Sequence, residues 1–181
     1  MSEFSVEQLN ARAASMPRAV SIYDEVLAIC ADNLPDFLRD HNLPVPRTYD
    51  YAGVRIEGDK WPALLVGGSV RTDASGHFYM DSNLVAIIFA FAGPVITREQ
   101  LRTATDAVQL IRVLMAMPTV VGPRYADPET RTSIIWNTLL PAAQGVSPVP
   151  PNYPHFQGMQ AHFDVNQYPV TANLWPTGDD T

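Results

Sequence analysis

The sequence has few of the residues that mark particular protein classes. Among 181 residues there is one cysteine, Cys30, and one lysine, Lys60. A single cysteine excludes an internal disulfide, so nothing indicates an oxidising compartment. Cys30 lies on the apolar side of a helical pattern, where we expect a small buried core residue rather than a nucleophile.

Charge is also scarce. Charged residues make up 17% of the chain, against about 25% in an average protein. The 12 basic residues are scattered and the formal net charge is -7, which argues against binding nucleic acid through a basic face. A chain short of charge leaves neutral surface that an oligomer can bury.

Long apolar segments are missing as well. The longest, residues 84–95, is about a dozen residues, whereas a membrane-spanning helix needs about 20. The first residues, Met1 to Phe4, are acidic and lack the apolar core of a signal peptide. We therefore expect a soluble protein, cytoplasmic when made, with no membrane partner.

Catalytic motifs are absent too. Gly67-Gly68 is the only glycine pair and fits no phosphate-binding loop, so we expect a bulge or a strand end there. The segment from Asp73 to His77 holds an acid, a hydroxyl and an imidazole. Those residues suit a tight turn for backbone reasons, and triad members normally come from separate segments.

The histidines do not have metal-ligand spacing. His155 and His162 are seven residues apart, which on a strand places their side chains on opposite faces. The sequence therefore predicts no catalytic, cofactor-binding or metal-binding residues, no cofactor, and a protein that is not an enzyme.

Three helices are predicted. A capping box at Ser5–Gln8 begins a short helix to about Ala14, and another at Thr97–Gln100 begins a helix to Met117. Between them a helix follows Pro17, and Pro35 predicts a kink or a restart in it. The apolar stripes, spaced by three and four residues, are Val20, Tyr23, Val26, Leu27, Cys30, Leu34, Phe37 and Leu38 in the middle helix, and Leu101, Ala104, Val108, Ile111, Leu114 and Met115 in the last.

Five strands are expected, at residues 51–57, 63–71, 78–92, 131–140 and 156–167. Residues 84–92 are apolar on both faces of the pleat. This favours a central strand covered on both sides, or one partly covered by a neighbouring subunit. Residues 144–154 contain several prolines and are predicted to form a long extended loop.

These elements predict an α+β fold: a mainly antiparallel sheet packed against two amphipathic helices, with an extended proline-rich C-terminal arm. We divide the chain into an N-terminal short helix or arm (1–16), a core domain (17–140), and a C-terminal region (141–181). That region holds the loop, a final strand at about 156–167 that pairs with the core sheet, and a tail. Trp175 in the tail either pins it to its own domain or docks on a partner.

The element order resembles that of the tail terminator proteins of long-tailed bacteriophages and the related neck and tail-completion proteins. The resemblance covers roughly residues 18–168 and is carried by element order rather than by a motif. Its carriers are the 23–38 helical stripe, Trp61-Pro62-Ala63-Leu64-Leu65-Val66, the long 78–92 strand, the 97–117 helix and the 156–167 strand.

The resemblance implies a virion protein, made in the host cytoplasm, that forms a ring, typically a hexamer. Such a ring caps the tail tube and faces the head-tail connector, with DNA passing through its lumen and no sequence-specific nucleic-acid contact. Residues 141–181 are longer than that pattern, which leaves open another position in the neck or another minor virion protein.

Two other interpretations stay open on the sequence alone. One is a small enzyme or ligand-binding domain whose site is built from the scattered residues Asp73, His77, His155 and His162. The other is a non-viral scaffold or adaptor that presents the loop 144–154 to a partner peptide.

Overall fold

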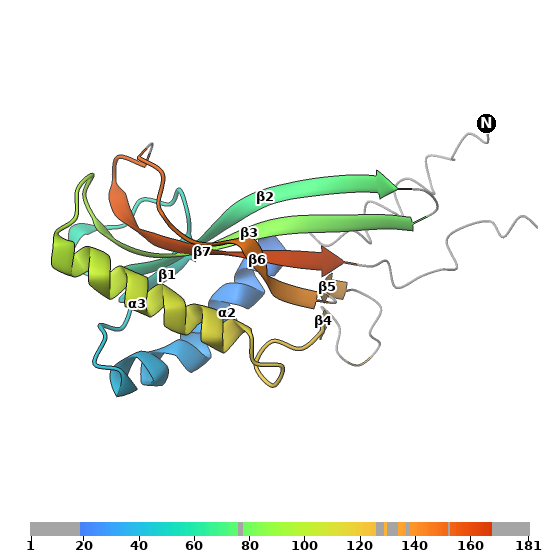
Figure 1. The fold of residues 1–181 in the computed structure, drawn as a ribbon, viewed down its shortest axis with the longest axis horizontal. Helices are drawn as coiled ribbons and strands as arrows, with labels where there is room; N and C mark the ends of the chain where they lie inside the picture. The colour runs from blue at the N-terminus through green and yellow to red at the C-terminus, as the bar shows by residue number, and fades with distance from the viewer. Residues whose placement is uncertain are drawn as a thin grey trace, which may run out of the picture.

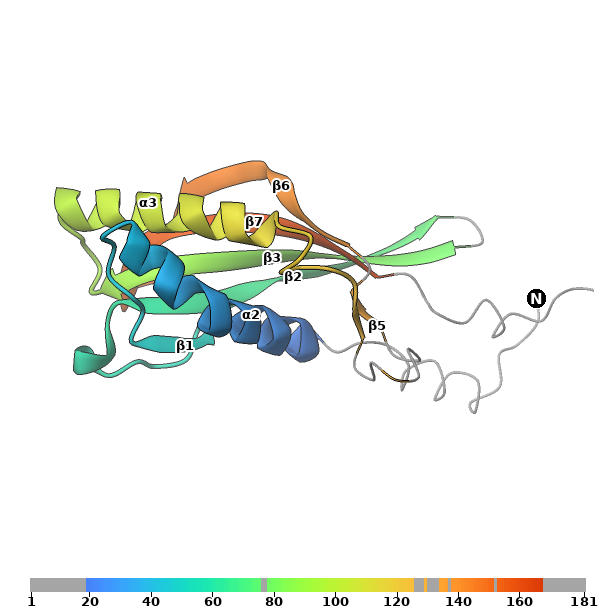
Figure 2. The ribbon, with the colours of Figure 1, turned by 90° about the horizontal axis from the view of Figure 1, so that it is seen from below.

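The protein is a twisted sheet with two long helices on one face (Figures 1 and 2), which confirms the predicted α+β class. The computed structural model describes residues 19–75, 78–125, 129, 134–136, 138–151 and 153–167. The predicted helix at 5–14, the turn residue His77 and the tail with Trp175 lie outside them.

The two helices are α2 (Ala19–Asp40) and α3 (Arg98–Met115). The strands are β1 (Thr48–Tyr51), β2 (Ala63–Ser75), β3 (Phe78–Ala92), β4 (Arg124–Tyr125), β5 (Ile134–Trp136), β6 (Thr138–Pro148) and β7 (Phe156–Gln167). A 3₁₀ turn, η1 (Gly58–Lys60), precedes β2.

The main sheet has the order β1-β2-β3-β7-β6. β1 is parallel to β2, and the other neighbouring strands are antiparallel. β4 and β5 form a separate two-stranded ribbon. β3 and β7 match the predicted bounds, because residues 84–92 of β3 are apolar, most of β7 alternates, and β3 ends at the breaker Gly93-Pro94.

The prediction for β3 is confirmed: it is the middle strand and is covered on both faces. Val85, Ile87 and Phe89 face the helices in the main core. Ala86 and Ile88 face the opposite side, where they join a second, smaller core. We call that opposite side the outer face. Its small core is made by Ala63, Leu65, Ala86, Ile88, Ala90, Val149 and Phe156, with Ala52, Ile56, Trp61 and Tyr153 packed against it.

The helix predictions hold with one correction. Of the two alternatives predicted at Pro35, a kink or a restart, the structure excludes the restart: α2 continues to Asp40, since Leu34 and Leu38 are fully buried on either side of the proline and hold the helix on the sheet. In α3 the predicted capping box is present, with Thr97 and Gln100 bonded reciprocally. Leu101, predicted to be buried, is 41% exposed, because it lies at the edge of the stripe that faces the core.

Three strand predictions need correction. The first strand is Thr48–Tyr51 rather than 51–57, because Gly53 has a positive φ of 111° and the Val54 N–H bonds back to Tyr51. β2 runs to Ser75, past the expected end at Arg71, because its pairing with β3 continues to Ser75↔Phe78.

The third correction concerns residues 131–151. The predicted strand 131–140 corresponds to β5 and the start of β6, and β6 continues through the first half of the predicted loop to Pro148. Its pairing with β7 is interrupted by a bulge between Pro141 and Val146, which contains Gly145 at a φ of 65°. The bulge lets a proline-rich segment stay in the sheet because the register is recovered at Val146↔Ala161.

β3 is approached closely on both sides by glycines. A Cβ added at Gly158 of β7 would lie 2.1 Å from the Phe89 carbonyl oxygen. One added at Gly68 of β2 would lie 2.0 Å from the Leu84 carbonyl oxygen. Real Cβ atoms do not approach backbone oxygens this closely, so both positions require glycine.

Candidate functional site

The outer face of the sheet carries an open hollow, which is the candidate site. It has a volume of about 220 Å³ and lies over β2, β3 and β7. Ala86 and Ile88 of β3 form its floor, and Gln160 and His162 of β7 form its polar side. The remaining lining residues are Ala52, Gly67, Gly68, Leu84 and Tyr153.

Alternation along β7 positions the polar side of the hollow. Ala161, Phe163 and Val165 are fully buried against the helices. The residues between them, Gln160 and His162, therefore face the other way, toward the hollow.

His162 is neutral in this setting. Burial lowers the pKa of His162 below its ordinary value, and a hydrogen bond to the Gly145 backbone offsets only part of that effect. Its Nδ1 is buried without a hydrogen-bond partner. None of the described lining residues carries a carboxylate or a basic group, so with a neutral imidazole this part of the hollow is uncharged.

Gln160 is the buried polar residue of the core, and its amide is already engaged. Its Nε2 donates to Ser147 Oγ and to the Pro148 carbonyl oxygen, each at 3.3 Å. Gln160 therefore holds the end of β6 against β7 and leaves the floor of the hollow to apolar groups.

One end of the hollow is closed by the segment that follows β6. Val149 donates its N–H to the Gly158 carbonyl oxygen at 3.0 Å and is buried. Tyr153 lies against Phe156, with ring centroids 5.0 Å apart, and Trp61 approaches Phe156 from the other side at 6.2 Å. The described residues of 149–156 thus pack on the outer face, and residues 144–148 belong to β6, which corrects the prediction of a long extended loop without secondary structure at 144–154.

Of the four scattered residues of the enzyme hypothesis, the structure describes the side chains of His155 and His162, and it does not bring these two together. His162 lines the hollow. His155 is exposed just before β7, where its carbonyl oxygen accepts from the Gly93 N–H at 2.9 Å. The side chains of Asp73 and His77 lie outside the described part of the structure. Within that part, no group of three or more potential metal ligands exists.

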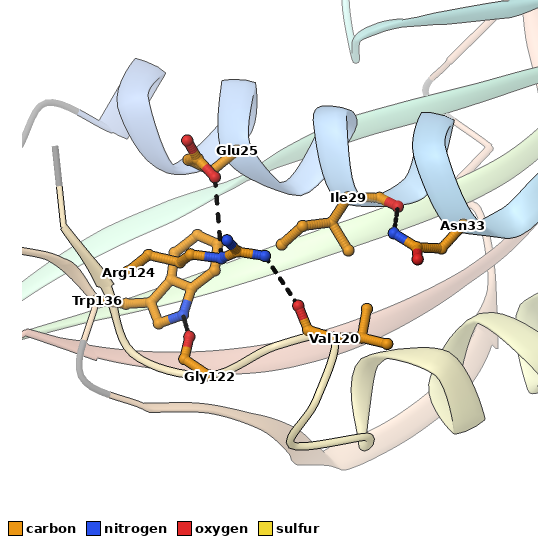
Figure 3. Close-up of polar contacts among 7 residues, drawn as sticks. All are labelled: Glu25, Ile29, Asn33, Val120, Gly122, Arg124 and Trp136. Atoms are coloured by element: carbon orange, nitrogen blue, oxygen red, sulfur yellow. Dashed lines mark hydrogen bonds and ion pairs between the residues drawn. The ribbon is translucent and has the colours of Figure 1, made fainter. Parts of the chain in front are cut away.

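A second polar cluster ties the segment after α3 to α2 (Figure 3). Arg124 donates to the Val120 carbonyl oxygen at 2.9 Å, and its Nε lies 4.0 Å from the Glu25 carboxylate. The buried Trp136 donates its Nε1–H to the Gly122 carbonyl oxygen at 3.0 Å. These contacts hold the β4–β5 ribbon against α2 and the segment after α3.

Cys30 is the core residue that the helical pattern predicts. It is fully buried in α2, and burial raises the pKa of the thiol to about 12. A thiol held neutral in this way is neither a nucleophile nor a metal ligand. Burial likewise raises the pKa of Tyr49 to about 12, with Cys30 as a secondary cause.

Sequence reasoning named His162 but missed the hollow, because the lining comes from segments more than 90 residues apart, from Ala52 to His162. One signal was available. The outward positions of β7 from 158 to 162 are Gly158, Gln160 and His162, uncharged residues where an exposed strand normally carries charge; the next outward residue, Asp164, is exposed and charged. Among the described residues no helix is long and apolar enough to cross a membrane. No protein-family model matches the sequence, and no curated protein matches it either.

Proposed function

We propose that this protein is a structural virion protein that assembles into a ring at the end of a bacteriophage tail, as a tail terminator or neck protein. The observation that carries the proposal is the open edge of β2. β2 pairs with β1 only over Ala63–Val66, and from Gly67 to Ser75 no described strand lies on its outer side (Figure 2).

The other edge of the sheet is protected in a way that the β2 edge is not. β6 carries Pro141, Pro148 and a bulge, features that prevent another strand from adding. The open part of β2 contains no proline, and its register with β3 is unbroken. One edge of the sheet is therefore suited to accept a strand from another chain, and the opposite edge is not.

The last residues of the open edge, beyond Thr72, belong to an arm in which only β2 and β3 pair. β7 pairs with β3 only as far as Asp81↔Gln167, whereas β2 and β3 stay paired to Ser75↔Phe78. The hairpin reaches beyond both helices (Figure 1). An isolated two-stranded hairpin is marginally stable in water, so packing against a neighbour would stabilise this one.

A protruding acceptor edge suits a heterologous interface, in which each subunit contacts the next with a different surface. Such interfaces close into rings when the rotation between subunits allows it. In this proposal the ring, most simply a hexamer, contacts the tail tube protein on one side and the head-tail connector or neck proteins on the other. DNA passes its lumen without sequence-specific contact, and no cofactor takes part. The low charge of the chain supports burial of neutral surface between subunits.

Proline substitution in the open edge tests the proposal. Along β2, the N–H groups of successive residues point alternately to β3 and to the open edge. One of the two substitutions V70P and R71P therefore removes only an N–H of the open edge, and the other removes a hydrogen bond to β3. The variant that keeps the wild-type circular dichroism spectrum should lose the oligomer seen by light scattering. L140A, at an exposed position of the protected β6 edge, is the matched control and should assemble as wild type. Normal assembly by a folded outward-proline variant would contradict the proposed interface.

A further inference from the structure

We propose that the hollow on the outer face is the docking site of the chain's own C-terminal tail, and that Trp175 is the side chain that fills it. This inference concerns a contact within one subunit and does not depend on ring assembly.

The hollow is suited to a single large aromatic side chain. Its volume of about 220 Å³ is below the roughly 300–1,000 Å³ of pockets that take drug-sized ligands. Part of the lining has little or no side chain, at Ala52, Gly67 and Gly68, so a flat ring can lie close to the backbone there. Tyr153 presents an aromatic ring at the closed end of the hollow. None of the described residues that line it carries a charged side chain, and burial lowers the pKa of His162, so these residues do not favour a charged ligand.

The floor itself is buried, since Ala86 and Ile88 are 9% and 2% exposed, but the hollow stays open toward the hairpin end. There Leu84, on the same face of β3, is only half-buried. An aromatic side chain placed here would complete the second core toward the hairpin end. Burying a tryptophan removes roughly 150–250 Å² of its surface from water.

The tail begins in the right place and is long enough. β7 ends at Gln167, five residues beyond His162 on the same strand, which is about 17 Å at 3.3 Å per residue. Trp175 is eight residues beyond Gln167, a reach of up to about 27 Å. That reach exceeds the distance of about 17 Å back to His162, so the length of the tail allows Trp175 to return to the outer face.

The other tryptophans already have partners in the fold. Trp136 is buried and donates to Gly122, and Trp61 packs on Phe156. The chain therefore supplies one further indole, on a tether that begins beside the hollow.

The test uses the full-length chain with ¹⁵N-labelled tryptophan, whose three indole N–H signals report on Trp61, Trp136 and Trp175 separately. W175F assigns the third signal. We expect it to lie away from the position of a free indole and to be shielded from a soluble paramagnetic agent. A86F, which fills the hollow, should move it to the free-indole position and remove the shielding. L140F, at an exposed site on β6, is the matched control and should leave it unchanged.

Each remaining outcome overturns the proposal. A Trp175 signal that is exposed in the wild-type chain shows that the tail does not dock, and this holds even if A86F fails to fold. If the Trp175 indole signal stays shielded and does not shift in a folded A86F variant, the tail docks at some other place. Shielding that disappears across a dilution series shows that a tail from a second copy occupies the hollow.

Discussion

Replacing Gly158 with alanine should destabilise the protein sharply. The added Cβ would lie 2.1 Å from the Phe89 carbonyl oxygen and 2.8 Å from the Ala90 Cα. Both are backbone atoms of the central strand, which is packed on both faces and cannot move away freely. Forcing an extra methyl group into a packed site costs about 1–3 kcal/mol.

For a domain of this size each kcal/mol lowers the melting temperature by about 2–4 °C, so G158A should melt roughly 2–12 °C below wild type. Thermal unfolding followed by circular dichroism measures this directly. G58A is the matched control: a Cβ there meets nothing within 4 Å, and the substitution should be neutral or slightly stabilising. Equal melting temperatures for G158A and wild type would refute the close approach of β7 to β3.

Three further predictions concern the helices and the core. T97A removes the capping box of α3 and should lower the free energy of unfolding in urea by about 1 kcal/mol. E25Q removes a partly exposed ion pair at 4.0 Å and should lower it by less than about 0.5 kcal/mol. Equal effects of the two substitutions would contradict this ranking. Because the pKa of Cys30 is raised to about 12, the folded chain keeps a proton that the unfolded chain loses above its ordinary pKa of 9.0. The free energy of unfolding should therefore fall between about pH 9 and 12 by up to about 1.4 kcal/mol per pH unit, and C30A should flatten that part of the profile. At pH 8 Cys30 should react with a thiol reagent only after denaturation, and rapid labelling of the native chain would show that it is not buried.

The elements that the sequence predicted well are those with one dominant signal. α3 has a capping box at Thr97 followed by a regular apolar stripe, and its start agrees with the structure. β7 alternates over its whole length, so its bounds and its buried face were both predictable. In each case local preference and long-range packing favour the same conformation.

The misassigned segments are those in which packing overrides local preference. Pro141, Gly145 and Pro148 argue against a strand locally, yet β6 forms because β7 supplies partners on either side of a bulge. Pro35 argues for a helix break, yet burial of its neighbours keeps α2 continuous. The hollow could not be predicted for a related reason. Its lining depends on which strands are adjacent in the sheet, and no single segment of the sequence determines the strand order.

The most direct test of the proposed function is the mass of the purified protein, measured by light scattering behind a sizing column, alone and mixed with virion tails. The proposal predicts a discrete ring, or a monomer that becomes a ring on tail ends, and loss of either form in the folded proline variant of β2. A protein that stays monomeric at all concentrations and does not bind virion tails would contradict the proposed function.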